Sequence, residues 1–379
     1  EYKYGEVKSI KRAEYSFNPY FIIETSKDVY HAKSVIIGTG TKYKKLESMK
    51  TVVKKFARQF SSLILAMALG SAVVSCDSIL DEEEIDCSIT YKVDFKYDYN
   101  MKYADAFANE VKSVTLYAFD NNGKLVYQKT EEGAVLAQGD YAMNVDMQAG
   151  EYQLVAWAGL NDDDSFSVPL ITPGASIEEL QCRMDRVYTR NEDGGAIVNS
   201  RLSTLFHGQV TKHAFTSRAA MEQVVTIPLV KNTNTIKVIL HQMDGVAIPA
   251  EDFEFTITDN NGLMDYDNSL LEDEELTYHS YHHEAGFLEE DGVTRADGEG
   301  INNISFATAE LTVGRLVKNQ NAMLTIRNKQ TDETILRIPL IKMFLLAKMQ
   351  GQYNMEDQEY LDRQDEYRMT FFLDKTMKW

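Results

Sequence analysis

Hydrophobic and polar residues alternate with a period of two in several stretches of this chain. Phe253, Phe255 and Ile257 alternate with polar neighbours, and the same alternation occurs over 235–240 and 367–374. Successive side chains of a β-strand point to opposite faces of a sheet, so this pattern predicts strands that bury one face. The chain is therefore expected to be mainly β.

Two predicted strands lead into the same turn sequence, Asp-Asn-Asn-Gly. The strand over 114–117 is followed by Asp120–Gly123, and the strand over 253–257 is followed by Asp259–Gly262. Glycine accepts the positive φ that a tight hairpin turn requires. Two similar strand–turn units, about 140 residues apart, predict two related β-sandwich domains in tandem.

Helical patterns are confined to a few short stretches. Apolar residues spaced as on one helix face predict a helix over Tyr103–Val111, and a further helix is predicted over Lys342–Met349. Ser176 and Glu179 have the spacing of a capping box, which opens a helix. These few short helices are expected to brace the sandwiches, and they imply no catalysis.

A continuous apolar run over Leu63–Val74 has a different meaning. It is 12 residues long, which suits a signal peptide and is too short to span a bilayer. Four basic residues precede it: Lys50, Lys54, Lys55 and Arg58. Val73–Cys76 fits a lipobox, in which a small residue stands before the cysteine. We expect translation to begin at Met49, a lipoprotein signal peptide over 49–75, and lipidation of Cys76.

The segment before the signal peptide is predicted to form strand, turn and strand. Phe21–Thr25 and Val29–Ala32 are followed by a third apolar stretch that ends in Gly-Thr-Gly. Residues 1–46 resemble a short piece of a thioredoxin-reductase-like flavoprotein, in which glycine lets the backbone approach FAD. The segment contains neither a G-x-G-x-x-G loop nor a C-x-x-C pair. Residues 1–48 are therefore interpreted as a spurious or fused fragment.

The predicted signals divide the chain into five segments. Residues 1–48 and 49–75 are followed by an acidic tether over 76–87, a first β-sandwich domain over 88–240 and a second over 241–379. The tether contains four consecutive acidic residues, Asp81 to Glu84. Such a run after a lipidated cysteine resembles the signal by which lipoproteins of Bacteroidota reach the outer face of the outer membrane.

The negative charge of the chain argues against partners that are themselves strongly negative. The whole chain carries −19, and residues 1–75 contribute 13 basic and 6 acidic residues, or +7. The 304 residues from Cys76 onward therefore carry −26. Phosphate repels such a surface, so nucleic acid is not an expected partner. Attachment to a membrane must then come from acyl chains rather than from attraction to anionic lipid.

Two cysteines remain if Cys76 is consumed by lipid. Cys87 and Cys182 form an even pair in an exported protein, which is compatible with a disulfide. Two buried free thiols would look the same in sequence, so both readings stay open.

Three histidines offer the strongest metal-binding pattern in the sequence. His279, His282 and His283 lie within five residues, a spacing at which imidazoles bind transition metals. No second ligand cluster accompanies them, so a surface loop is the favoured interpretation. Asp259–Asn268 is rich in oxygen ligands but lacks the final glutamate of an EF-hand, so it is interpreted as a turn.

The remaining candidates also favour structural roles. Asp98, Asn100 and Asp105 are interpreted as caps of the helix that follows them. Trp157 lies in an apolar strand and is expected in the core rather than on a sugar-binding platform. No G-x-S-x-G, H-E-x-x-H or P-loop motif is present, so no catalytic residue, cofactor or metal site is assigned.

Eight stretches together, in order along the chain, resemble the FimB-like family of fimbrial anchor lipoproteins of Bacteroidota. They are residues 97–107, 114–120, 150–159, 205–208, 232–238, 253–259, 265–268 and 358–363. The resemblance covers the chain from about Cys76 to Trp379. Members of the family usually continue past the position of Trp379, so the second domain is expected to be truncated at its C-terminus.

The resemblance implies two tandem transthyretin-like β-sandwich domains and a role that is not enzymatic. In the family the lipidated N-terminus holds a fimbria to the outer membrane. Cys76 matches the lipidated cysteine, and Cys87 matches a second cysteine that commonly follows it. The implied partners are fimbrial or pilin subunits, which join by donation of a β-strand. Two alternatives stay open: a surface glycan-binding or adhesive lipoprotein, and a hydrolase with dispersed catalytic residues.

Overall fold

The computed structural model describes residues 7–12, 21–25, 29–32, 89–189, 195–217, 222–242, 246–288 and 304–373. The chain divides into two compact units, Glu1–Glu83 and Glu84–Trp379. In the first unit, β1 (Val7–Arg12), β2 (Phe21–Thr25) and β3 (Val29–Ala32) form an antiparallel sheet in that order. The two strands predicted in this segment are confirmed. The predicted signal peptide over 49–75 lies outside the described residues.

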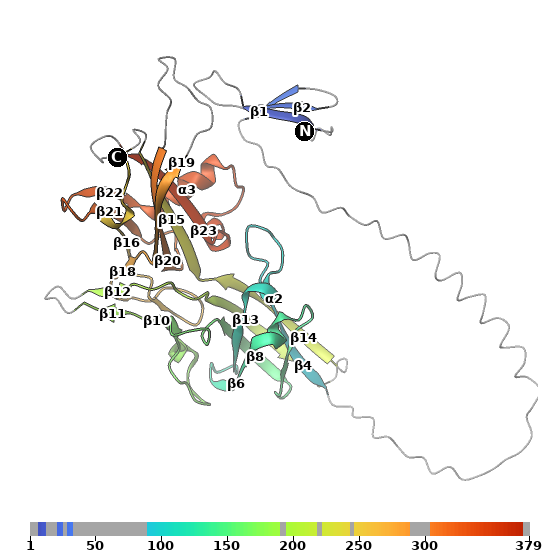
Figure 1. Ribbon diagram of the computed structural model, residues 1–379. Helices are drawn as coiled ribbons and strands as arrows, with labels where there is room; N and C mark the ends of the chain where they lie inside the picture. Colours follow the sequence, from blue (N-terminus) through green and yellow to red (C-terminus); the bar gives the residue numbers. More distant parts are fainter. Residues whose placement is uncertain are drawn as a thin grey trace, which may run out of the picture. The chain divides into compact units, whose positions relative to one another are not determined.

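The second unit begins with a seven-stranded sheet in the order β6-β5-β8-β13-β14-β4-β7 (Figure 1). Its strands are β4 (Thr90–Lys96), β5 (Ser113–Phe119), β6 (Leu125–Glu132), β7 (Met143–Val145), β8 (Gly150–Ala158), β13 (Phe206–Phe215) and β14 (Glu222–Lys231). The pair β4–β14 is parallel and the other pairs are antiparallel. We call this sheet and its connections the first half.

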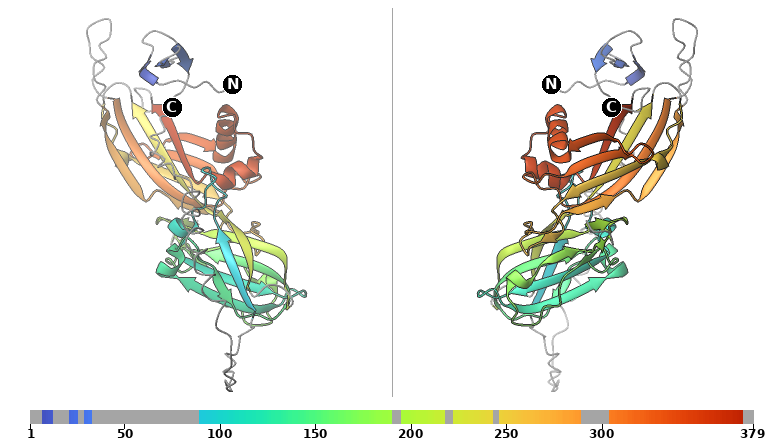
Figure 2. Two further views of the ribbon diagram at one scale, coloured as in Figure 1. Left: turned by 90° about the vertical axis from the view of Figure 1, so that its right-hand side faces the viewer. Right: turned by 90° about the vertical axis from the view of Figure 1, so that its left-hand side faces the viewer.

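The second half of the unit contains two further sheets (Figure 2). One has the order β19-β20-β15-β23 and the other the order β11-β12-β18-β16-β21-β22. The four-stranded sheet consists of β15 (Thr233–Gln242), β19 (His282–Leu288), β20 (Ile304–Gly314) and β23 (Glu366–Leu373). The six-stranded sheet consists of β11 (Val187–Tyr188), β12 (Ala196–Val198), β16 (Phe253–Asp259), β18 (Leu276–His279), β21 (Met323–Asn328) and β22 (Thr334–Pro339).

Strand β23 shows why the alternating pattern predicted these sheets well. Its residues alternate between exposed and buried along the whole strand, and Tyr367, Met369 and Phe371 contribute to the hydrophobic core. The predicted strands over 114–117, 235–240, 253–257 and 367–373 are all confirmed. The mainly β fold is confirmed with them.

The first part of the chain contributes strands to a sheet of the second half, which the sequence did not indicate. Strands β11 and β12 precede β13 in the chain, yet β12 pairs with β18 of the second half. A small sheet of β9 (Phe166–Ser167), β10 (Cys182–Met184) and β17 (Leu263–Met264) also joins segments from both.

The passage from the first half to the second lies earlier than the expected boundary at 240/241. That boundary falls inside β15, which starts at Thr233 and pairs with β20 and β23 along its whole length. The chain passes between the halves at Asn232, the single residue between β14 and β15. Alternation shows which face of a strand is buried, but not which sheet the strand joins.

Helices in the second unit are short. They are α2 (Phe107–Glu110), η1 (Gly133–Ala137), η2 (Ile177–Glu179), η3 (Ala250–Asp252), α3 (Leu340–Gln350) and α4 (Asp357–Arg363). The helix over 342–349 is confirmed as α3. The segment with the capping box forms a single 3-10 turn, in which the Ser176 amide donates to the Glu179 carboxylate at 2.8 Å. Among the described residues, no helix combines the length and apolar character needed to cross a membrane.

Two expected elements differ from the structure. The helix expected over 103–111 is reduced to Phe107–Glu110, because Tyr103 has a φ of 51°, outside the helical region. The turn at Asp120–Gly123 joins β5 to β6 as expected, with Gly123 at φ 68°. Asp259–Gly262 closes no hairpin, since β16 pairs with β18 and β21 rather than with the strand that follows it.

Candidate functional site

A single hydrophobic core extends from the first half into the second. Tyr117 and Trp157 of the first-half sheet belong to the same buried cluster as Ile236 of β15 and Phe255 of β16. Trp157 is 0% exposed, so the prediction that it is a core residue is confirmed. We call the region where the halves meet the junction. Separating or rotating the halves would expose this shared apolar surface, so the two halves pack as one compact unit.

The crossing point of the chain is fixed by a pair of buried asparagines. Asn232 is 0% exposed, and its amide nitrogen donates to the Asn268 side-chain oxygen at 2.6 Å. Asn268 returns a hydrogen bond from its own amide nitrogen to the Asn232 side-chain oxygen at 3.1 Å. The Asn232 backbone amide donates to the Leu205 carbonyl at 2.7 Å. Buried polar groups that are satisfied in this way define one arrangement of the chain.

Asn268 also connects to an ion pair on α4. Arg315 donates to the Asn268 carbonyl oxygen, and it forms two 2.9 Å hydrogen bonds with the two carboxylate oxygens of Asp362. The side chain of Asp362 is only 7% exposed, and Gln358 donates to it as well. This bidentate geometry fixes the helix at the end of β20.

A second contact between the halves is aromatic. Arg363 of α4 lies over the rings of Tyr99 and Tyr103, at 4.1 and 4.6 Å from their centroids. Its guanidinium also donates to the carbonyl oxygens of Asp98 and Asn100 at 3.3 and 3.4 Å. The loop that replaces the start of the predicted helix therefore holds the second half through cation–π contacts.

Asp105 organises that loop. Its carboxylate accepts from the backbone amides of Tyr97 and Phe107, both at 3.0 Å. The Asn100 side chain donates to the carbonyl oxygens of Tyr97 and Ala104, both at 2.9 Å. The N-cap of α2 is Ala106, with no side-chain cap hydrogen bond, so the expected capping role of Asp105 is not confirmed. Asn100 closes the loop instead of capping the helix.

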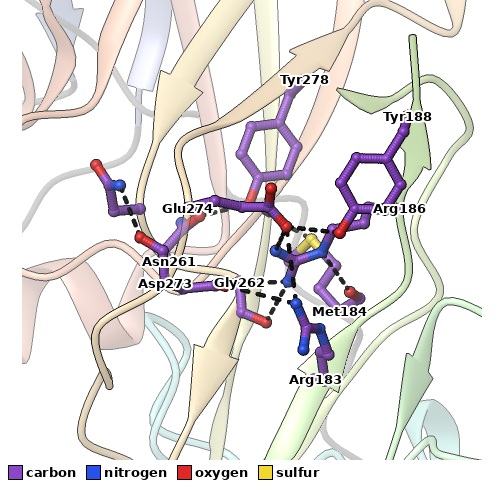
Figure 3. Close-up of polar contacts among 10 residues, drawn as sticks. Arg183, Met184, Arg186, Tyr188, Asn261, Gly262, Asp273, Glu274 and Tyr278 are labelled. Atoms are coloured by element: carbon purple, nitrogen blue, oxygen red, sulfur yellow. Dashed lines mark hydrogen bonds and ion pairs between the residues drawn. The ribbon is translucent and has the colours of Figure 1, made fainter. Parts of the chain in front are cut away.

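A third contact is the buried guanidinium of Arg186 (Figure 3). Its side chain is 3% exposed, lies 2.7 Å from the Asp273 carboxylate, and donates to Glu274 at 3.0 Å. It also donates to the carbonyl oxygens of Met184 and Gly262 at 3.2 and 3.1 Å. Burial alone would lower the pKa of Arg186, but the two carboxylates outweigh it and raise the pKa.

The Arg186 contact depends on the glycine at position 262, because a side chain there would occupy the space of the guanidinium. A Cβ atom on Gly262 would lie 2.6 Å from the Arg186 guanidinium and 2.7 Å from the Asp273 carboxylate. Beside it the Asn261 side chain accepts a hydrogen bond from the Tyr278 hydroxyl and donates to the Arg315 carbonyl at 3.1 Å. The Asp-Asn-Asn-Gly turn at 259–262 thus contributes contacts to the junction and does not close a hairpin.

His207 of β13 is the buried titratable group at the junction. Its ring is edge-on to Trp157, with centroids 4.6 Å apart, and its Nε2 lies 2.8 Å from the Tyr266 carbonyl oxygen. Burial lowers the pKa of His207 to about 4. The imidazole is therefore neutral at pH 7, and Nε2 carries the proton that it donates to Tyr266.

A polar cleft of about 650 Å³ opens beside the junction on the outer face of the four-stranded sheet. Lys237 and Glu310 pair across neighbouring strands at 3.1 Å, and Tyr281 donates to Glu310 at 3.2 Å. Lys231 lies 2.8 Å from Asp365. Burial alone would lower the pKa of Lys231, but the attraction of its carboxylate partners outweighs burial and raises it.

Comparisons with known proteins place these features in a family. The model of the fimbrillin-A-associated anchor proteins Mfa1 and Mfa2 matches residues 83–379. The chain belongs to this family.

Similar proteins support the assignment to the Mfa2 family. The minor fimbrium anchoring subunit Mfa2 of Porphyromonas gingivalis is 23% identical over 304 residues, which are 79% of this chain and 84% of that protein. A crystal structure of a candidate adhesin from Bacteroides thetaiotaomicron is 33% identical, with a TM-score of 0.66, and covers 77% of this chain and 93% of its own.

The fold is also shared with the solved structure of the fimbrial anchor protein Mfa2 from P. gingivalis. That structure is 19% identical, with a TM-score of 0.54, and covers 76% of this chain and 91% of its own. The family model begins at residue 83, so it lends no support to the thioredoxin-reductase resemblance of residues 1–46. The narrower resemblance to FimB-like members stays a prediction.

Two of the three predicted cysteine positions cannot be compared with the structure. Cys76 and Cys87 lie outside the described residues, so lipidation stays a prediction. Cys182 is 0% exposed and forms no disulfide with another described residue, and burial raises the pKa of its thiol. Pairing of Cys87 with Cys182 likewise stays a prediction.

The histidine cluster expected in a surface loop lies in strands instead. His279 ends β18, and His282 and His283 open β19, so the turn between them carries the chain from one sheet of the sandwich to the other. Within the described part of the chain, no three His, Cys, Asp or Glu side chains are arranged to hold a metal ion.

The residues that define the junction of this Mfa2-family chain were mostly missed in sequence. Asn232, Asn268 and Arg363 lie inside the stretches that carried the family resemblance, but no role was assigned to them. Arg186 and Arg315 gave no signal, because a buried arginine and an exposed one look the same in sequence.

Proposed function

We propose that this chain is an outer-membrane lipoprotein that anchors a fimbria to the cell surface. Acyl chains on Cys76 attach it to the membrane, and fimbrial subunits join it by β-strand complementation. The observation that carries the proposal is the family match over residues 83–379. The proposal includes the finer fold assignment, in which the two halves are transthyretin-like sandwiches.

The junction supports a mechanical role. An anchor transmits tension from the fimbria to the membrane, so its halves must not hinge under load. Three separate contacts join the halves: the Asn232–Asn268 hydrogen bonds, the cation–π contact of Arg363 with Tyr99 and the Arg186 ion pairs. Contacts that are buried and geometrically specific resist such rotation better than exposed ion pairs do.

The edge of the four-stranded sheet supports strand complementation. β23 is the terminal strand of that sheet, and β15 is its one neighbour among the described strands. Its buried residues already contribute to the core, so a strand added beside it would extend an existing apolar surface. Affinity in strand addition comes from main-chain hydrogen bonds, which require no diagnostic side-chain motif.

Fractionation of cells tests the membrane attachment. Cys76→Ala should move the protein from the outer membrane to soluble fractions, because one or more acyl chains are lost. Cys87→Ala is the matched control and should remain in the membrane. Cells that carry the Cys76→Ala protein alone should shed their fimbriae into the medium. Fimbriae that stay attached to those cells would contradict the anchor function.

An adhesive role is the second candidate function. It is favoured by the similarity to the B. thetaiotaomicron candidate adhesin, at 33% identity. The two roles are compatible, since an anchor at the cell surface can also contact a host or neighbouring cell. Loss of adhesion without loss of fimbriae would separate them.

A further inference from the structure

The outer face of the four-stranded sheet carries a row of aromatic side chains. His241 of β15 lies in register with Phe306 of β20 on one side and Phe372 of β23 on the other. The rings of His241 and Phe372 stack, with centroids 5.5 Å apart and planes 26° apart. Leu240 and Phe371 beside them are buried in the core, so the row faces outward. Phe372 is 57% exposed, which is unusual for a phenylalanine in a regular strand.

The row ends at a glycine that lets the neighbouring ring lie flat. Gly286 of β19 lies in register with Phe306, and a Cβ atom there would come within 3.0 Å of the Phe306 ring. A larger residue would push that ring away from the sheet. We call Phe372, His241, Phe306 and Gly286 the aromatic row.

The aromatic row continues into the polar cleft across two further rows of the same face. The first contains Thr370, Ile239, Thr308 and Glu284, and the second contains Arg368, Lys237, Glu310 and His282. Lys237, Glu310 and His282 also line the cleft. One surface therefore combines aromatic rings with polar groups that are held in fixed positions.

The charges of the cleft balance. Its lining contains three cations, Arg201, Lys231 and Lys237, and three carboxylates, Glu310, Asp365 and Glu366. In a chain of net charge −19 this is a locally neutral surface. Such a surface has no preference for an anion or a cation, but its paired donors and acceptors suit hydroxyl groups, which both donate and accept.

Two polar atoms on this face have no hydrogen-bond partner among the described residues. They are Nδ1 of His241 and the hydroxyl oxygen of Thr308, which lie in neighbouring rows. Both atoms are buried, so a ligand contacts the exposed groups around them rather than the atoms themselves.

We propose that this face binds a neutral oligosaccharide. The apolar C–H faces of the sugar rings lie on the aromatic row, as they do on aromatic side chains generally, and the hydroxyls bond the Lys237–Glu310 pair. This site shares strand β23 with the edge proposed for strand addition, but it uses outward side chains, whereas strand addition uses main-chain hydrogen bonds.

Calorimetric titration of the full chain with defined sugars tests the site. The neutral probes are maltoheptaose, mannohexaose and laminarihexaose, and heparin is the anionic probe. We expect at least one neutral probe to bind and heparin not to compete with it. Failure of all three neutral probes to bind, or preference for heparin, would overturn the proposal.

Four variants locate the binding. Phe372→Ala and Glu310→Gln should each weaken binding about tenfold, since each removes one principal contact. Phe372→Tyr keeps the ring and should bind like the parent, which separates a lost contact from a misfolded protein. Phe287→Ala is the matched control. Phe287 is 48% exposed on β19, but it lies on the opposite face of the sheet from the aromatic row. Equal binding by the parent and Phe372→Ala would contradict the proposal.

Retention of fimbriae separates this site from the anchor function. Glu310 lies on β20, away from the β23 edge, so cells that carry Glu310→Gln should keep their fimbriae while the purified protein binds sugar about tenfold more weakly. If the variant instead loses binding of fimbrial subunits and sugar binding is unchanged, the face is a protein interface and the proposal fails.

Discussion

Asn232 and Asn268 exchange side-chain hydrogen bonds of 2.6 and 3.1 Å where the chain passes from β14 to β15. Asn268 adopts a φ of 70°, a conformation that asparagine tolerates better than most residues. The pair therefore joins a residue with an unusual backbone conformation in the second half to the residue that follows β14 of the first half.

Removing one member of this pair should weaken the whole second unit. Asn232→Ala leaves the Asn268 amide buried without a partner, so the free energy of unfolding should fall by about 1–3 kcal/mol. Denaturant titration of both proteins measures it. The control is Asn122→Ala, in an exposed turn, which should change stability by no more than about 0.5 kcal/mol. A loss at Asn232 no larger than that of the control would show that the pair is dispensable.

Arg186 should be the most sensitive charged residue of the junction. Arg186→Met leaves the buried Asp273 carboxylate with only the exposed Arg183 at 3.7 Å, so the unfolding free energy should fall by about 3–5 kcal/mol. Arg183→Met is the matched control, since Arg183 is 50% exposed and lies 3.7 Å from the same carboxylate. It should lose less than about 1 kcal/mol. Equal losses in the two variants would mean that burial of the guanidinium does not matter.

Gly262→Ala tests the close approach beneath Arg186. The new methyl group meets Arg186, Asp273 and Leu276 within 2.7 Å, so the unfolding free energy should drop by about 1–3 kcal/mol. Gly139→Ala serves as the comparison, because no atom lies within 4 Å of a Cβ atom at that position. Thermal unfolding of the two proteins measures the difference. A stable Gly262→Ala protein would imply that the turn can shift.

His207 should make stability depend on pH. Burial lowers its folded pKa to about 4, whereas an unfolded histidine has a pKa near 6.5. Below pH 6.5 the unfolded chain binds the proton that the folded chain excludes, so stability is lost as pH falls from 6.5 towards 4. Between pH 7.5 and pH 5 the loss from this residue should be about 2 kcal/mol.

Comparison with His207→Gln isolates that contribution. The stability advantage of the parent over the variant should shrink by about 2 kcal/mol between pH 7.5 and pH 5. Asp259 has the opposite dependence, because burial raises its pKa to about 6 and its stabilising effect is lost as pH rises through that value. This effect is common to both proteins and cancels in the comparison. An advantage that does not vary with pH would contradict a buried neutral His207.

Much of the β architecture was predictable because it depends on local alternation. The pattern over 367–374 correctly predicts β23, and the Asp-Asn-Asn-Gly sequence at 120–123 correctly predicts a hairpin. The same sequence at 259–262 does not form one. Instead, its Asn261 side chain accepts from Tyr278 and its Gly262 carbonyl accepts from Arg186, residues that alternation alone does not place nearby.

By itself the sequence determined that the chain is mainly β, which residues of each strand are buried, and that Trp157 belongs to the core. These properties follow from a period of two and from the hydrophobic effect, both of which act locally along the chain. Tertiary structure alone decided that β11 and β12 join a sheet of the second half, and that His241, Phe306 and Phe372 form one row. Contacts between strands more than 60 residues apart depend on pairing order and register, which single-strand patterns do not encode.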